Sequence, residues 1–156
     1  MGHVSIDMEI EATPDEVWTV VSDPRNLPRW DRHIISVQGV PDDGLAEGDH
    51  YTTELKMMGV RGTVEAEVVE MVAPRRSRIR LRGLLDATVN TSVSPLAGGR
   101  RALLEHDVEY HFRGGGLAAF ATQGLQITGG PSVVLRRGAL AQKRQIEDMV
   151  RRNRAD

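Results

Sequence analysis

The sequence predicts an α+β fold in which a curved antiparallel sheet of about seven strands packs around a long C-terminal helix. The first strand candidate alternates apolar and polar residues, further strand candidates follow without an intervening helix, and helical periodicity begins after the glycines at 114–116. Consecutive strands joined by short turns favour an antiparallel sheet. The 156 residues are the size of one domain, so we predict a single domain over residues 1–156.

The first strand is predicted at Val4–Glu11, where apolar and polar side chains alternate with a period of two. A helix follows, because Thr13 is placed to cap it, Pro14 suits its first position and Glu16 completes a capping box. A second, short helical turn is predicted at Pro24–Trp30, since an internal proline prevents a longer one. The inward side of the first helix is formed by Val17, Trp18 and Val21.

The middle of the chain contains six further strand candidates. Turn residues, mainly glycine, proline and aspartate, separate them and are typical of hairpin connections. The six ranges are Ile34–Val40, His50–Met57, Val60–Met71, Arg76–Leu84, Ala87–Ser94 and Arg101–Arg113.

The C-terminal part of the chain is predicted to be helical. One helical segment covers Leu117–Ile127, and a longer helix begins at Ser132 after two glycines and a proline. This longer helix should lie across the concave side of the sheet, because it has an apolar stripe and a basic remainder. The stripe consists of Leu135, Ala139, Ile146, Met149 and Val150.

Composition excludes several classes of function. A net charge of -2 provides no positive field for nucleic acid, and the absence of cysteine excludes disulfides, thiolate metal sites and cysteine nucleophiles. We see no signal peptide and no apolar run of about 18 residues, so we expect a cytoplasmic protein that does not span a membrane. His106 and His111 point to opposite faces of one strand, and the glycine-rich stretches lack a nucleotide-binding fingerprint. We therefore expect no metal and no cofactor.

Two segments near the N-terminus resemble a known family. Thr13–Trp18 reads TPDEVW and Asp23–Trp30 reads DPRNLPRW, similar to the xAPxExVW helix and the DxxxxPxW turn of the START-like (SRPBCC) superfamily. Glu70–Arg80 is similar to a strand-turn-strand midway through those domains. The resemblance covers nearly the whole chain and implies a helix-grip fold with a pocket between sheet and helix. It implies no single function, because this scaffold serves polyketide cyclases, lipid carriers and partner proteins.

The last strand candidate places His106 and Tyr110 on its apolar face, which should look toward the helix and the pocket. Two polar-tipped rings on an apolar wall are typical of a small-molecule site. Alternatively, the protein itself supplies their hydrogen-bond partners, for instance from the C-terminal helix. Residues four apart on a strand are separated by roughly 13 Å, so the two rings cannot form a proton relay with each other.

Two further ligand-binding candidates are apolar. Trp30 ends the short helix that, by the resemblance, forms a lid at the pocket entrance, where an indole offers a flat surface to a ring-shaped ligand. Packing of the small helices on the sheet is the alternative for Trp30, and Trp18 is assigned to the core. Met57, near a strand end, would provide a soft lining.

Four arginines, Arg76, Arg78, Arg80 and Arg82, alternate along the strand predicted at Arg76–Leu84. Counting back through the preceding turn places Glu67 opposite Arg80 and Glu65 opposite Arg82. Opposite charges facing each other across strands contribute about 0.2–1 kcal/mol per pair, so we interpret the row as a salt-bridged outer surface and not a nucleic-acid site. The apolar residues that follow break the pattern and predict a bulge near Val68–Val69.

Three functions remain open. The first is binding or transport of a small hydrophobic molecule, lipid-like or aromatic. The second is a polyketide aromatase/cyclase, in which the pocket orients the substrate and His106 or Tyr110 moves protons. The third is an accessory partner of a larger enzyme, with which the basic tail Arg151–Arg154 is compatible, although complementing the helix dipole also explains that tail. A homodimer or another protein partner also remains open.

Overall fold

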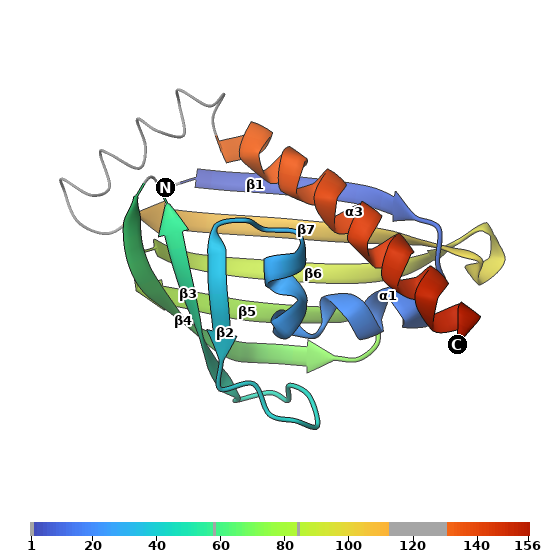
Figure 1. Ribbon diagram of the computed structural model, residues 1–156, viewed down its shortest axis with the longest axis horizontal. Coiled ribbons are helices and arrows are strands. Elements are labelled where there is room, and N and C mark those ends of the chain that lie inside the picture. Colours follow the sequence, from blue (N-terminus) through green and yellow to red (C-terminus); the bar gives the residue numbers. More distant parts are fainter. Residues whose placement is uncertain (1, 58, 84, 113–130) are drawn as a thin grey trace.

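The computed structural model (Figure 1) describes residues 2–57, 59–83, 85–112 and 131–156. Its antiparallel strands form one seven-stranded sheet in the order β1-β7-β6-β5-β4-β3-β2, so β1 and β2 are the edges. Figure 1 shows the helices gathered on one face of this sheet, with the C-terminal helix crossing over β1 and β7. The predicted α+β helix-grip arrangement is confirmed. Within the described residues, no helix is long and apolar enough to cross a membrane.

The elements follow the predicted order. The strands are β1 (Gly2–Ile10), β2 (Ile34–Gln38), β3 (His50–Met57), β4 (Val60–Val72), β5 (Arg76–Gly83), β6 (Leu85–Leu96) and β7 (Arg101–Phe112). The helices are α1 (Pro14–Val21) and α3 (Pro131–Ala155), with short 3-10 helices η1 (Pro24–Arg29) and η2 (Ala97–Gly99). The helix predicted at Leu117–Ile127 lies outside the described residues.

β6 is longer than the predicted Ala87–Ser94 and includes Pro95. A proline inside a central strand would remove a ladder hydrogen bond. The last β5 residue paired with β6 is Arg76, opposite Ser92, so Pro95 lies beyond the end of β5 and is paired only with Ala102 of β7. Its missing N–H therefore costs the sheet nothing on the β5 side.

The register between β4 and β5 agrees with the charge pattern of the sequence. Glu67 faces Arg80 and Glu65 faces Arg82, as predicted. The Arg80 guanidinium lies 3.6 Å from the Glu67 carboxylate. The predicted bulge is also present, as a shift in register between Val68 and Glu70. These charges lie on the outer face of the sheet, away from the helices.

α1 begins with the predicted capping box. The Glu16 backbone N–H donates to the Thr13 hydroxyl, and the Thr13 N–H donates to the Glu16 carboxylate. Arg154 near the end of α3 also donates to this carboxylate, through Nε at 2.9 Å. The buried residues of α1 are Val17, Trp18 and Val20. Val21, which the sequence predicts to face inward, is only half-buried.

The core consists of two clusters. The first joins α1 and the C-terminal half of α3 to β1, β6 and β7, and includes Trp18, as predicted. The second lies on β3 and β4 around Tyr51, Ala66 and Val68. Met71 packs partly buried against both. Of the predicted stripe on α3, Ile146 and Val150 are buried in the first cluster with Met149 packed against it.

Candidate functional site

A band of half-buried side chains covers the inner face of the sheet beside the two core clusters. In the register of the sheet, Ile6, His106 and Thr91 form one row across β1, β7 and β6, and Val4, Val108 and Val89 form the next. All six are half-buried, although they face the helix side of the sheet. We call this set the inner band. It is apolar except for one row that contains an imidazole and a hydroxyl.

His106 connects the sheet to α3. Its Nε2 lies 2.9 Å from Oε1 of Gln142, which is 6% exposed, and its Nδ1 lies 2.9 Å from the Thr91 hydroxyl. Because a carboxamide oxygen only accepts, Nε2 donates to Gln142 and the Thr91 hydroxyl donates to Nδ1. Both ring nitrogens therefore have partners within the protein. The sequence raised the alternative that the C-terminal helix supplies a hydrogen-bond partner for His106, and Gln142 is such a partner.

Burial lowers the pKa of His106 below the usual value, and the hydrogen bond to Gln142 opposes this shift. The imidazole is consequently neutral near pH 7. A neutral ring with one donor and one acceptor matches the two partners that hold it. The inner band thus presents no charge from this residue.

Tyr110 lies on the inner face toward the N-terminal end of β1. It is paired with Gly2 in the register of the two strands. A side chain added at Gly2 would collide with the phenol ring, since its Cβ would overlap Cζ of Tyr110. The ring therefore lies over the backbone of β1 at the glycine, two residues beyond Val108 along β7.

The two apolar candidates are in different positions. Trp30 ends η1 and packs half-buried against the first core cluster. Met57 ends β3, opposite Val60, and its side chain falls outside the described part of the structure. The structure thus groups His106 and Tyr110 on β7, and it places Trp30 with the packing of the small helices.

Comparison with known proteins identifies the family. A family model described as polyketide cyclase / dehydrase and lipid transport matches residues 1–142. The chain belongs to this family. None of the curated proteins compared with the sequence matches it.

Solved structures of other proteins share this fold. A START superfamily protein from Mycobacterium smegmatis has 19% identity and a TM-score of 0.71, with 94% of this chain and 98% of that chain covered. The Zhui aromatase/cyclase from Streptomyces sp. R1128 has 15% identity and a TM-score of 0.72, with 97% and 94% covered. A Deinococcus radiodurans protein has 17% identity and a TM-score of 0.69, with 94% and 98% covered. The predicted START-like resemblance is confirmed, and at these identities the likeness concerns the fold.

In this member of the polyketide cyclase/dehydrase and lipid-transport family, sequence reasoning missed two polar positions on the inner face. Gln142 occupies the apolar stripe of α3, between Ala139 and Ile146, and a polar residue at stripe spacing was the signal that could have found it. Tyr51 of β3 is buried in the second core cluster, and burial raises its pKa to about 12. Tyr51 is therefore a neutral phenol across the physiological pH range.

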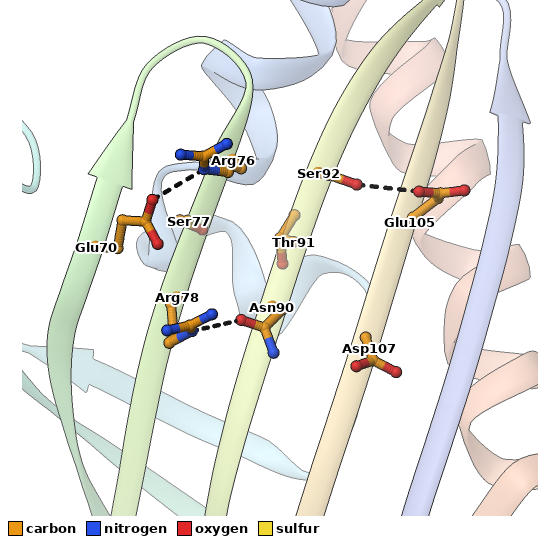
Figure 2. A pocket seen from close by; sticks show the side chains of 9 residues that line it. All are labelled: Glu70, Arg76, Ser77, Arg78, Asn90, Thr91, Ser92, Glu105 and Asp107. Atoms are coloured by element: carbon orange, nitrogen blue, oxygen red, sulfur yellow. Dashed lines mark hydrogen bonds and ion pairs between the residues drawn. The ribbon is translucent and has the colours of Figure 1, made fainter.

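The outer face of this family member contains a polar hollow of about 440 Å³. Figure 2 shows two of its arginines bonded to neighbouring side chains: Arg76 donates to Glu70 at 2.9 Å and Arg78 donates to Asn90 at 2.8 Å. These contacts account for the arginine row as a structural feature of the sheet. The hollow lies on the face opposite α3, and Thr91 is the one inner-band residue that also lines it. Among the described residues, no group of three His, Asp or Glu side chains is arranged to hold a metal ion.

Proposed function

We propose that the chain binds a small hydrophobic molecule, lipid-like or aromatic, against the inner band beneath α3. One observation carries this proposal: the apolar side chains of the band face the helix and yet remain half-buried, while those of the neighbouring clusters are closed off. Contiguous apolar surface that the protein leaves partly uncovered marks an interaction site. The family description, which includes lipid transport, supports the same class of ligand.

The polar groups of the band support selection by shape and apolar contact. Thr91, His106 and Gln142 satisfy one another, so they offer a ligand little hydrogen bonding without breaking a bond inside the protein. Tyr110 contributes a ring above Gly2 at the end of the band. A flat or chain-like apolar molecule suits such a surface better than a polar one does.

The second candidate function is a polyketide aromatase/cyclase, supported by the family description and by the shared fold with the Zhui enzyme. A general base must reach the substrate proton with a free lone pair. In His106 that lone pair accepts from Thr91, and the other nitrogen donates to Gln142, so catalysis by this ring requires one of these bonds to break. Product profiling with a polyketide synthase tests this activity. Unchanged products with wild type, His106→Gln and Tyr110→Phe would exclude the two rings from catalysis.

The third function, a partner of a larger enzyme, receives less support. The basic tail is engaged within the chain: Arg154 binds Glu16 and Arg151 binds Asp148. These bonds favour the interpretation of the tail as the end of a helix. A pull-down that recovers a stoichiometric partner would revive this function.

Ligand binding can be tested with a hydrophobic fluorescent probe and two tryptophan variants. In Val108→Trp the indole would fill the inner band, and in the matched control Glu109→Trp it would project from the exposed outer face of the same strand. Titration with N-phenyl-1-naphthylamine should show affinity for the wild type and the control, and a loss of about tenfold or more for Val108→Trp, equivalent to about 1.4 kcal/mol. Circular dichroism checks that both variants fold.

Two outcomes would reject the binding proposal. One is equal affinity of both variants for the probe, which would place the probe elsewhere. The other is a chain that stays empty when protein purified from its own host is examined by native mass spectrometry and then screened against lipids and aromatic compounds. Val108→Ala provides a second check, because removing two methyl groups from the band should retain probe binding.

A further inference from the structure

β1 has an unpaired edge beside α3. β7 pairs with one edge of β1, and among the described residues no strand pairs with the other. A hollow of about 400 Å³ runs along this edge, lined by residues 5–8 of β1 and by Arg136, Ala139, Leu140 and Lys143 of α3. Leu140 is 59% exposed, the most exposed of the large apolar residues described. This edge adjoins the inner band, with which its hollow shares Ile6, and the proposed ligand binding does not use its backbone groups.

The C-terminal end of the β1 edge is already bonded to α3. Lys143 Nζ donates to the Glu9 carbonyl at 2.6 Å, and the Glu11 N–H donates to the Glu147 carboxylate at 2.8 Å. Backbone groups alternate sides along a strand, so these two contacts indicate that odd-numbered residues direct their N–H and C=O away from β7. His3, Ser5 and Asp7 therefore carry the backbone donors and acceptors of the open part of the edge.

We propose that this edge pairs with the same edge of a second copy of the chain, in an antiparallel arrangement about a two-fold axis at Ser5. This register uses the open residues and leaves the Glu9 carbonyl with Lys143. Ser5 then pairs with Ser5 of the second copy, and His3 pairs with Asp7. A two-fold contact of this kind closes on itself and joins the two sheets into one.

Charge complementarity selects a second copy as the occupant. Asp7 of β1 lies directly opposite Glu105 of β7, and like charges opposite each other destabilise a sheet. Asp7 has no hydrogen bond or ion pair with a described residue, and in the dimer it meets His3 of the other chain on the outer face, where the His3 ring already contacts Asp107 of its own chain. On the inner face Val4 meets Ile6 of the other chain. One nine-residue strand thus supplies both halves of a matched pair.

The edge also lacks two of the features that usually prevent such pairing. Exposed edge strands are commonly protected by proline or lysine, and β1 (GHVSIDMEI) contains neither. α3 supplies one lysine, Lys143, which is bonded at the end of the strand. A strand added in the hollow would lie beside Leu140 and cover it.

A cysteine cross-link tests the register directly, because the natural chain has no cysteine. Directly opposite residues of a hydrogen-bonded antiparallel pair, as Ser5 and its copy would be, have Cα atoms about 5.5 Å apart, within the range that a disulfide spans. Ser5→Cys should therefore form a disulfide-linked dimer of twice the 17.2 kDa chain mass under mild oxidation. The matched control is Ile35→Cys, an exposed position on the opposite edge strand, β2, and it should cross-link much more slowly.

Sedimentation velocity from about 1 µM to about 100 µM measures the dimer without a cross-link, over a range suited to a weak interface. The wild type should show a reversible monomer–dimer equilibrium. Asp7→Pro removes a backbone donor from the open edge and Leu140→Glu places a charge beside it, and each should raise the dimer Kd at least about tenfold. Ile35→Glu should leave the Kd unchanged. Because Leu140 is mostly exposed, Leu140→Glu keeps the test valid if Asp7→Pro fails to fold.

Three results would overturn the proposal. They are a wild type that remains monomeric throughout the concentration range, a dimer that survives both Asp7→Pro and Leu140→Glu, and a cross-linking rate at Ile35→Cys equal to that at Ser5→Cys. A chain that stays monomeric but binds a foreign extended peptide at this edge would also overturn the proposal. Probe binding to the inner band is measured in a separate experiment with Val108→Trp, so failure of one proposal is distinguishable from failure of the other.

Discussion

His106 Nε2 of β7 and Gln142 Oε1 of α3 lie 2.9 Å apart, and this contact joins the sheet to the helix that covers it. Thr91 extends the contact to β6 through the other ring nitrogen. The position of α3 over the inner band thus depends on a polar bridge as well as on the apolar cluster around Ile146. The bridge is buried at its helix end, where an unpaired polar group would be costly.

Replacing Gln142 should therefore destabilise the protein. Gln142→Leu leaves the buried His106 N–H without an acceptor, and we expect the free energy of unfolding to fall by about 1–3 kcal/mol in urea denaturation. Combining it with His106→Leu should cost less than the sum of the two single changes, with a coupling of about 0.5–3 kcal/mol. Additive costs would show that the two side chains do not depend on each other.

Gln145 provides the matched control for this experiment. It lies on the same helix and is half-buried, and no hydrogen bond joins its side chain to a described residue. Gln145→Leu should change the free energy of unfolding by less than about 0.5 kcal/mol. A loss as large as that of Gln142→Leu would attribute the effect to helix composition and not to the bridge.

The lowered pKa of His106 gives a pH dependence of known sign. Above 6.5, the usual pKa of histidine, the ring is neutral in both the folded and the unfolded chain. As the pH falls below that value the unfolded chain binds the proton first, so the free energy of unfolding decreases until the folded pKa is reached. The difference between wild type and His106→Gln, measured by urea denaturation from pH 7.5 to pH 5 (about one unit or more on either side of a histidine pKa), isolates this residue. A difference that does not vary with pH would contradict the lowered pKa.

Sequence patterns predicted the strands well because their information is local. Alternation assigned β1 and the two faces of β7, and the opposite charges of Glu67 and Arg80 gave the register between β4 and β5. Each inference needed only neighbouring residues or one short turn. The end of β6 was less accurate, because Pro95 argues against a strand until the length of β5 is known.

The contacts of the site depend on distant parts of the chain and could not be derived in this way. Thr91, His106 and Gln142 meet from two strands and a helix, and the His106–Gln142 contact spans 36 residues. Alternation correctly turned His106 inward but could not identify which side chain on α3 would meet it. The placement of the Tyr110 ring over Gly2 likewise depends on how β1 and β7 pair.

Arg154 should stabilise the junction between α1 and α3 through Glu16. Its hydrogen bond holds the pKa of the Glu16 carboxyl at about 2, below the usual 4.5. This contribution is present above pH 4.5 and is lost as the pH falls toward 2. We expect Arg154→Ala to lower the free energy of unfolding at pH 7 and to raise the Glu16 pKa, measured by NMR of the carboxyl carbon. Arg152→Ala, on the same exposed last turn, should leave that pKa unchanged; an equal shift would indicate a general effect of the basic tail.

Gly83 should tolerate no side chain, because two constraints act on it at once. Its φ of +142° lies where residues other than glycine are strained, and a Cβ there would lie 2.5 Å from the Thr63 carbonyl oxygen of β4. Backbone atoms of a central strand cannot move aside as a flexible side chain could, so we expect Gly83→Ala to cost at least about 2 kcal/mol. The matched control is Gly98→Ala, where φ is +68° and no atom lies within 4 Å, so only the backbone strain of about 1 kcal/mol applies. Urea denaturation of the two variants measures the difference. Equal losses would mean that the approach of β4 to Gly83 contributes nothing beyond the positive φ.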